Sequence, residues 1–413
     1  MIHAPRPSRL ASLFLLLLCA LLSACASGGG DAKNLVLVTF FPTTGLDADM
    51  GLALQQAVDL AVKQNGTLAN GYRLVAQHID EASPLHEGAL ATALSNPQVV
   101  GIVGPYSSET AVVVLPKIVA AGVMTVSPTT TLPGLTLSAA ATAENVPFDQ
   151  IHPSGKPLVF FRLAPSDDVL GKAAADLAVA PAASHGLAAH TIFVVDDATA
   201  SGKAGAEAFT TELKAKGGTV AGEQSLTTGV NDSSQFVVNA IIEAQPDLVF
   251  YAGGLKGGAA LRSTLTLTGA PQMPILAAGP VANNPGWSAA VGQPILSAPA
   301  SGVLPAADLA QLDSAKSFAS AWQAAYSGKA ALPQAALAYD ATMAEIAAIK
   351  SVLSSGKSPT RSAIATALAA TKFNGATGPI AFDQYGDSTA APSFSVYSCD
   401  TKGAWSYQTT LHS

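Results

Sequence analysis

The sequence predicts an α/β protein with two parallel β-sheets, each covered by helices on both faces. Short apolar runs typical of buried strands alternate with segments of helical period along most of the chain. The alternation forms two successive series, which indicates two separate sheets. The length of 413 residues agrees, because it is enough for two domains or lobes.

The first series begins with the apolar run 35–40, which has the composition of a buried strand. Leu54, Val58 and Val62 follow at four-residue spacing and mark one face of a helix. The same two patterns then alternate through the rest of the series. It predicts strands at 73–79, 99–103 and 123–126, and helices at 84–94 and 109–119.

A second series is expected to begin with a strand at 158–161. It predicts further strands at 191–195, 247–251 and 275–278, and helices at 173–179, 204–214, 235–243 and 259–267. Between the two series, residues 132–157 show no period and contain four prolines. We therefore expect an irregular insertion at a lobe boundary. After the second series come helices at 318–326, 336–353 and 361–369, and strand-like segments at 377–383 and 393–397.

The N-terminal residues have the pattern of an export signal. Arg6 and Arg9 precede the apolar run 10–22, which is too short for a comfortable membrane span. The run ends in Leu-Ser-Ala-Cys at 22–25, which resembles the bacterial lipobox. We therefore expect a signal peptide at 1–24, diacylation of Cys25 and a flexible linker at 25–33; two acyl chains give stable anchoring. An ordinary signal peptide, with Cys25 incidental, is the alternative.

Composition excludes several classes of function. Beyond Cys19 and Cys25 only Cys399 remains, so the mature chain has no internal disulfide. Removal of 1–24 leaves 389 residues and a formal charge of −9, which does not favour nucleic acid as a partner. His86-Glu87 lacks the second histidine of a zinc helix, and no metal or cofactor is expected. The chain also lacks a nucleophile elbow and a phosphate loop, so we do not expect an enzyme.

Local markers are distributed over nearly the whole mature chain: His78–Pro84 (HIDEASP), 101–111 (GIVGPYSSETA), 126–131 (VSPTTT), Phe161-Arg162, 165–168 (PSDD), 338–340 (AYD), 375–378 (GATG) and Phe382-Asp383. In their order and spacing they resemble the leucine/isoleucine/valine-binding family of type I periplasmic binding proteins. The resemblance implies two Rossmann-like lobes joined by three crossover strands, with a ligand between them. It places lobe I at 34–157 and 305–388, and lobe II at 158–304 and 389–413.

The turn after strand 99–103 is the first candidate for a ligand site. Ligands of open parallel sheets bind beyond the carboxyl ends of strands, and a helix N-terminus favours an anion. Ser107 and Ser108 lie at such a place, although serine there also commonly caps a helix. The resemblance implies that Ser108 contacts a ligand carboxylate.

Four further residues follow from the same resemblance. Thr129, through its backbone, and Thr131 inherit ligand roles, although a solvated loop is the alternative. Tyr106 is expected to stack on or wall the pocket, or else to be ordinary lobe surface. Met50 is expected to cover the ligand, or to pack at the start of a helix.

Lobe II departs from the family pattern. The acidic residue expected after strand 275–278 is missing from Gly279-Pro280-Val281. Ser201 replaces one aromatic wall, and Leu255 or Lys256 replaces the other. A buried ammonium without a counter-charge is costly, so we expect a carboxylate-bearing solute to be preferred over leucine, isoleucine or valine. The alternative is an acid that the fold brings in from elsewhere, and Lys256 is either solvated or paired with a second anionic group.

The function implied is that of an extracytoplasmic lipoprotein in amino acid or organic acid transport. It captures a small solute between its lobes and presents it to an ABC-type permease, while the lipid holds it to a membrane. The alternative is a regulatory or sensor lipoprotein that uses the same fold without transport.

Overall fold

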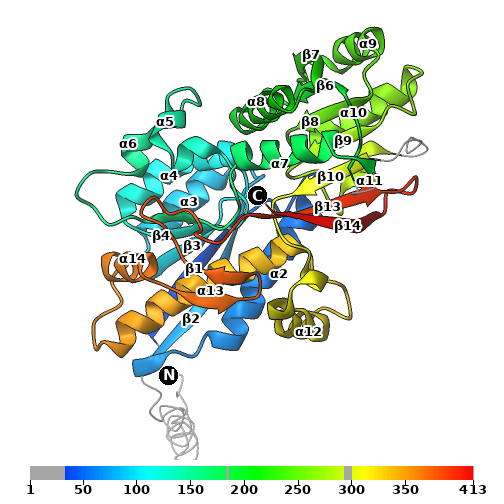
Figure 1. Ribbon diagram of the computed structural model, residues 1–413. Helices are drawn as coiled ribbons and strands as arrows, with labels where there is room; N and C mark the ends of the chain where they lie inside the picture. The colour runs from blue at the N-terminus through cyan, green and yellow to red at the C-terminus, as the bar shows by residue number, and fades with distance from the viewer. Residues whose placement is uncertain (1–32, 183–185, 293–299, 413) are drawn as a thin grey trace, which may run out of the picture.

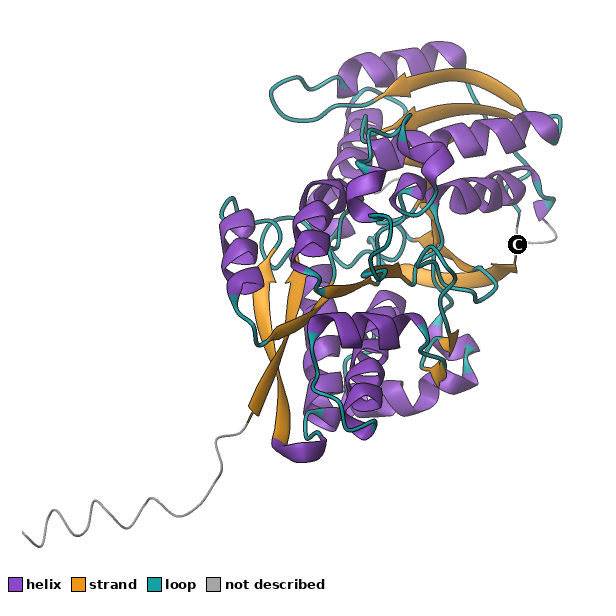
Figure 2. Cartoon of the chain, turned by 90° about the vertical axis from the view of Figure 1, so that its left-hand side faces the viewer, coloured by secondary structure: helices purple, strands orange, loops and turns teal. Residues whose placement is uncertain are grey.

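The computed structural model describes residues 33–182, 186–292 and 300–412, and its strands form two large sheets in separate halves of the molecule (Figures 1 and 2). The first sheet has the order β2-β1-β3-β4-β5, and all its neighbours are parallel. Its strands are β1 (Lys33–Phe41), β2 (Tyr72–Asp80), β3 (Val99–Val103), β4 (Met124–Ser127) and β5 (Phe160–Arg162). The expected parallel α/β architecture is therefore confirmed.

Helices cover both faces of the first sheet because its strands are apolar on both sides. In β1, Leu35, Leu37 and Phe41 pack in one core, whereas Val36, Val38 and Phe40 pack in the other. The first core lies against α2 (Ala48–Asn65), α13 (Pro333–Ser354) and α14 (Arg361–Ala369). The second lies against α3 (His86–Ser95) and α4 (Ser108–Ala121).

The second sheet has the order β14-β13-β10-β9-β8-β6-β7. The pairs β10/β13 and β13/β14 are antiparallel, and the other pairs are parallel. Its strands are β6 (Thr191–Asp196), β7 (Thr219–Ser225), β8 (Leu248–Ala252), β9 (Ile275–Ala278), β10 (Ala300–Leu304), β13 (Ser393–Cys399) and β14 (Trp405–His412). One face packs on α7 (Asp167–Val179) and α8 (Ala200–Ala215), and the other on α9 (Ser234–Ala244), α10 (Leu255–Leu267) and α11 (Trp287–Val291).

Smaller elements complete the half of the molecule built on the first sheet. The insertion between β4 and β5 carries two short helices, α5 (Ser138–Ala141) and α6 (Phe148–Ile151). Helix α12 (Lys316–Ala325) packs beside α2. The hairpin of β11 (Phe373–Gly375) and β12 (Gly378–Ile380) is attached to α13, because Asp340 accepts hydrogen bonds from the backbone N–H groups of Ala376 and Thr377.

The chain passes between the two sheets three times: after β5, after β10 and before β13. The second and third crossovers are joined where Ser395 donates its N–H to the carbonyl of Ala306 at 3.1 Å. The first and third are joined where the buried Arg162 side chain donates to Asp387. The three connections therefore lie side by side, as a hinge requires.

The structure corrects two of the expected boundaries. The strand at 158–161 does not begin the second series, because β5 pairs with β4 in the first sheet. We therefore place the start of lobe II after β5, at the first crossover, instead of at residue 158. Lys33, expected to end the linker, already belongs to β1.

The remaining expectations for the N-terminus fall outside the described residues. The signal peptide at 1–24 and Cys25 both lie there. Within the described ranges, no helix is long and apolar enough to cross a membrane.

Candidate functional site

A cavity lies where the carboxyl ends of the two sheets face each other. Its volume is about 180 Å³, and residues of both halves line it. All seven residues singled out from the sequence are in its wall: Met50, Tyr106, Ser107, Ser108, Thr129, Thr131 and Ser201. The fold therefore brings the predicted residues together, and their contact with a ligand stays a prediction.

Glu81 fixes the turn that carries Tyr106 and Ser107 through hydrogen bonds. The carboxylate of this buried residue accepts the backbone N–H groups of Tyr106 at 2.6 Å and of Ser107 at 2.9 Å. Burial raises the pKa of Glu81 to about 7, although these hydrogen bonds favour its ionised form. Gly104 precedes the turn with φ +130°, where a Cβ atom would lie 2.5 Å from the carbonyl oxygen of Phe40. Only glycine fits this approach.

The two serines at the start of α4 have different roles. Ser107 caps the helix, since its Oγ accepts the N–H of Thr110 at 3.0 Å. The Oγ of Ser108 accepts the N–H groups of Thr131 at 3.1 Å and of Leu132 at 3.2 Å. The capping alternative is thus correct for Ser107. Ser108 instead holds the next loop in place, and its own hydroxyl hydrogen is left to donate.

The loop after β4 is fixed by further hydrogen bonds. Thr129 donates its hydroxyl to the carbonyl of Tyr106 at 2.8 Å, and Ser127 accepts the N–H of Thr130 at 3.0 Å. The solvated loop considered for these threonines is therefore not what forms. These hydrogen bonds hold the loop in one conformation, and Thr131 lies in the cavity wall.

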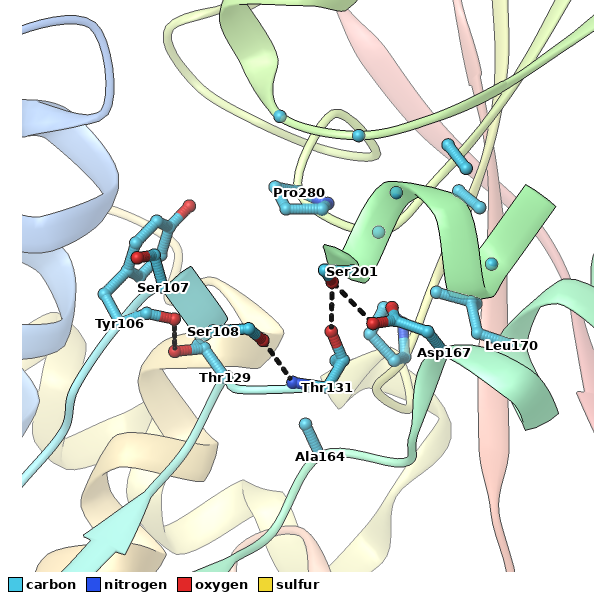
Figure 3. Close-up of a pocket in the computed structure, with 18 of the residues that line it drawn as sticks. Tyr106, Ser107, Ser108, Thr129, Thr131, Ala164, Asp167, Leu170, Ser201 and Pro280 are labelled. Atoms are coloured by element: carbon cyan, nitrogen blue, oxygen red, sulfur yellow. Dashed lines mark hydrogen bonds between the residues drawn. The ribbon is translucent and has the colours of Figure 1, made fainter. Parts of the chain in front are cut away.

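A hydrogen-bonded chain joins the two lobes across this cavity (Figure 3). The Oγ1 atom of Thr131, from lobe I, lies 3.3 Å from the Oγ atom of Ser201 at the start of α8. Ser201 in turn donates to a carboxylate oxygen of Asp167, in the first turn of α7. The site therefore combines the loop after β4 with the first turns of α7 and α8, which are far apart in the sequence.

The acid expected after strand 275–278 is absent, and the structure agrees with the alternative of acids that the fold brings in from elsewhere. Asp167 and Asp197 both line the cavity, together with Glu109 and Asp47 from lobe I. Asp167 is only 7% exposed, and burial raises its pKa to about 7. Burial also raises the pKa values of Glu109 and Asp47. Among the described residues, no Lys, Arg or His lines the cavity.

Asp197 owes its position to the loops that follow β6 and β8. It accepts the N–H of Gly254 at 2.8 Å and the N–H of Thr199 at 3.1 Å. Gly253 passes so close that a Cβ atom there would lie 2.5 Å from the carboxyl carbon of Asp197. This acid lies beyond the carboxyl end of β6, so the rule that indicated Ser108 also applies to it.

Lys256 is not part of the cavity. Its side chain is exposed, and the lining residues do not include it. Its charge instead acts on Asp232, whose pKa is lowered chiefly by hydrogen bonds from Ser234 and in smaller part by Lys256. The suggested second anion partner is therefore not placed to meet a solute. Gly279 and Pro280 do line the cavity, without an acid of their own.

A second hydrogen-bonded contact also joins the two lobes. Asn284 follows β9 and donates to Asp47 at the start of α2 at 3.3 Å. Tyr106 also donates to Asp47, at 3.4 Å.

The described residues contain no group of three or more His, Cys, Asp and Glu that could hold a metal ion. The arrangement is that of a small cavity between the lobes, with carboxyl and hydroxyl groups in a wall whose surface is otherwise largely apolar.

Comparison with known proteins agrees with this architecture. A family model described as periplasmic binding protein matches residues 37–404. A leucine-binding protein from Thermotoga maritima has a TM-score of 0.74 at 21% identity, over 91% of this chain and 98% of that one. Comparison with curated protein sequences gives no significant match.

Two solved structures of similar fold contain ligands. One is a branched-chain amino acid transporter substrate-binding protein from Streptococcus pneumoniae with isoleucine (TM-score 0.71, 19% identity, 92% of this chain and 99% of that one). The other is a solute-binding protein of an ABC transporter from Rhodopseudomonas palustris with benzoate (TM-score 0.67, 20% identity, 91% and 96%). These likenesses show the shared fold.

Proposed function

Because the chain belongs to the periplasmic binding protein family, we propose that it captures a small carboxylate-bearing solute and delivers it to an ABC-type importer. The observation that carries the proposal is the cavity between the lobes, whose wall combines Ser108 and Thr131 with Ser201 and Asp167. A ligand that contacts both halves stabilises the closed form, and a permease then recognises that form. The family is one of binding proteins, which agrees with a role other than catalysis.

The charge of the wall favours an amino acid over a simple organic acid. Within the part of the chain that the structure describes, four carboxyl groups and no basic side chain line the cavity. An ammonium group gains from a buried carboxylate such as that of Asp167, whereas a second anion is repelled. The carboxylate of the solute is expected at the N-terminus of α4, where the backbone N–H groups and the helix dipole favour negative charge.

We expect ligand binding to be measurable as closure of the hinge. A thermal-shift screen of the common amino acids and of aliphatic and aromatic carboxylates should identify a stabilising solute. Calorimetry then gives its affinity, and small-angle scattering at saturation should show a smaller radius of gyration than the free protein. Saturation without compaction would contradict a closure mechanism. Uptake of the labelled solute should also fall in cells that lack the protein, and unchanged uptake would favour the sensor alternative.

We also propose that the protein is held outside the cytoplasm by lipid on Cys25. The support is the signal-like segment 1–24 with its lipobox-like end, together with a family whose members are periplasmic. Two acyl chains on one residue give stable anchoring. The mature chain then extends from the membrane through the segment before β1.

Cys25→Ala is expected to release the protein from membranes or to leave the precursor unprocessed, because the acylated sulfur is removed. The measurement is membrane fractionation with the mass of the N-terminal peptide. Cys399→Ala is the matched control, since this buried cysteine lies in β13 of the folded domain. Normal processing and membrane association of Cys25→Ala would show that the anchor lies elsewhere.

A further inference from the structure

Gln334 lines the cavity and carries an amide oxygen without a hydrogen-bond partner in the described residues. It lies in the first turn of α13, directly after Pro333, and only 7% of its surface is exposed. Its Oε1 atom is buried and has no hydrogen-bond partner in the described part of the protein. The other cavity residues from this helix and from the end of β10 are apolar: Leu337, Leu304 and Pro305. Gln334 is therefore the polar residue in an otherwise apolar stretch of the wall.

A buried acceptor of this kind calls for a partner, because nearly all buried polar groups in native proteins are hydrogen-bonded. Other polar side chains of α13 show how the helix normally meets this demand. Asp340 accepts from Ala376 and Thr377, and Thr342 donates to the carbonyl of Ala338. The carboxylate oxygens of Glu345 also have no hydrogen-bond partner in the described residues. Glu345 packs beside Gly101 of the first sheet, however, and does not line the cavity.

We propose that Gln334 is a specificity residue that selects solutes with a hydroxyl or amide donor on the side chain. The inference rests on the proposed function and narrows its class of solute. With the charged groups of an amino acid at α4 and Asp167, Gln334 and its apolar neighbours are a part of the wall that is available to the side chain. A site built to pair a donor discriminates strongly against the analogue that lacks it, because its own acceptor is then left unpaired.

The test compares solutes of nearly equal size that differ in one donor. Threonine against valine and asparagine against leucine are two such pairs, and calorimetry gives the affinity of each. The wild-type protein should prefer the polar member of at least one pair by about tenfold or more. Gln334→Leu, which keeps the volume and removes the amide, should abolish or reverse that preference. Gln323→Leu, on the exposed surface of α12, is the matched control and should leave it unchanged.

The outcomes separate this inference from the proposed function. Binding of amino acids with a preference for valine and leucine, or a polar preference that survives Gln334→Leu, would overturn the role of Gln334 and leave solute capture intact. Failure of every carboxylate-bearing solute to bind would overturn both. If Gln334→Leu does not fold, Gln334→Met keeps an unbranched side chain of similar length and serves for the same comparison.

Discussion

Asp167→Asn is expected to weaken the binding of an amino acid by about a hundredfold, because the solute ammonium loses the charge of a buried carboxylate. Removing one partner of a buried charge pair costs about 2–5 kcal/mol, and each 1.4 kcal/mol is about tenfold in affinity. Asparagine keeps an oxygen that accepts the hydrogen bond from Ser201, so Ser201 keeps the position from which it contacts Thr131 of lobe I. Calorimetry with the solute found in the screen measures the effect.

The same residue predicts a pH dependence with a definite sign. Burial raises the pKa of Asp167 to about 7, so below pH 7 the free site is protonated and an ammonium must displace that proton. Affinity for an amino acid should fall by up to about tenfold per unit as the pH drops below 7, and it should level off above. An organic acid should show the opposite trend, since protonation removes a repelling charge. Glu109 and Asp197 face the same cavity. The contribution of Asp167 is therefore the difference between the pH dependence of affinity in the wild type and in Asp167→Asn.

Asp168→Asn is the matched control for both measurements. Asp168 is the next residue along the chain, does not line the cavity and accepts a hydrogen bond from Ser166. Equal effects of the two substitutions would show that general charge, and not a contact at Asp167, governs binding. An affinity for amino acids that does not vary between pH 5 and 8 would also contradict the assignment.

Elements with a clear apolar pattern could be predicted closely, whereas strands without one could not. The runs that became β3 and β9 have the predicted limits because they are buried throughout, and α14 has them because its buried residues recur with a helical period. Strands β7 and β14 were missed, since they form the two edges of the second sheet and expose part of their side chains. Strand β10 was missed because its five residues include serine and glycine and have no sustained apolar run. The hydrophobic pattern of a strand also does not show which strand it pairs with. For this reason β5 was assigned to the wrong sheet.

The site could be predicted only where a general rule singles out a position. Ser108 and Thr131 follow strands β3 and β4 at their carboxyl ends, where ligands of parallel sheets bind. Asp167 was missed as a cavity acid because it follows a crossover and begins a helix, so its position depends on how the lobes meet. Gln334 is separated from Thr131 by about half of the chain, and only the packing of α13 on the first sheet brings it to the cavity.

Ser108→Ala and Thr131→Val are each expected to weaken solute binding by about tenfold or more. A hydrogen bond to a charged group contributes about 1.5–3 kcal/mol. The hydroxyl hydrogen of Ser108 is left to donate to the solute carboxylate, and that of Thr131 does so in exchange for its hydrogen bond to Ser201. Ser108→Ala should have the larger effect, because it also leaves the N–H groups of Thr131 and Leu132 without the Oγ acceptor that positions their loop. Thr131→Val keeps the shape of the side chain and removes only its hydroxyl.

Stability measured beside affinity separates these two effects. Ser108→Ala should also lower the free energy of unfolding, by about 1–3 kcal/mol for buried donors left unpaired, whereas Thr131→Val should change it less. Thr92→Val, on the exposed face of α3, is the control for loss of a threonine hydroxyl in lobe I. Tight binding that survives both Ser108→Ala and Thr131→Val would mean that the carboxylate is held elsewhere. The N-terminus of α4 would then be only the structural support of the loop after β4.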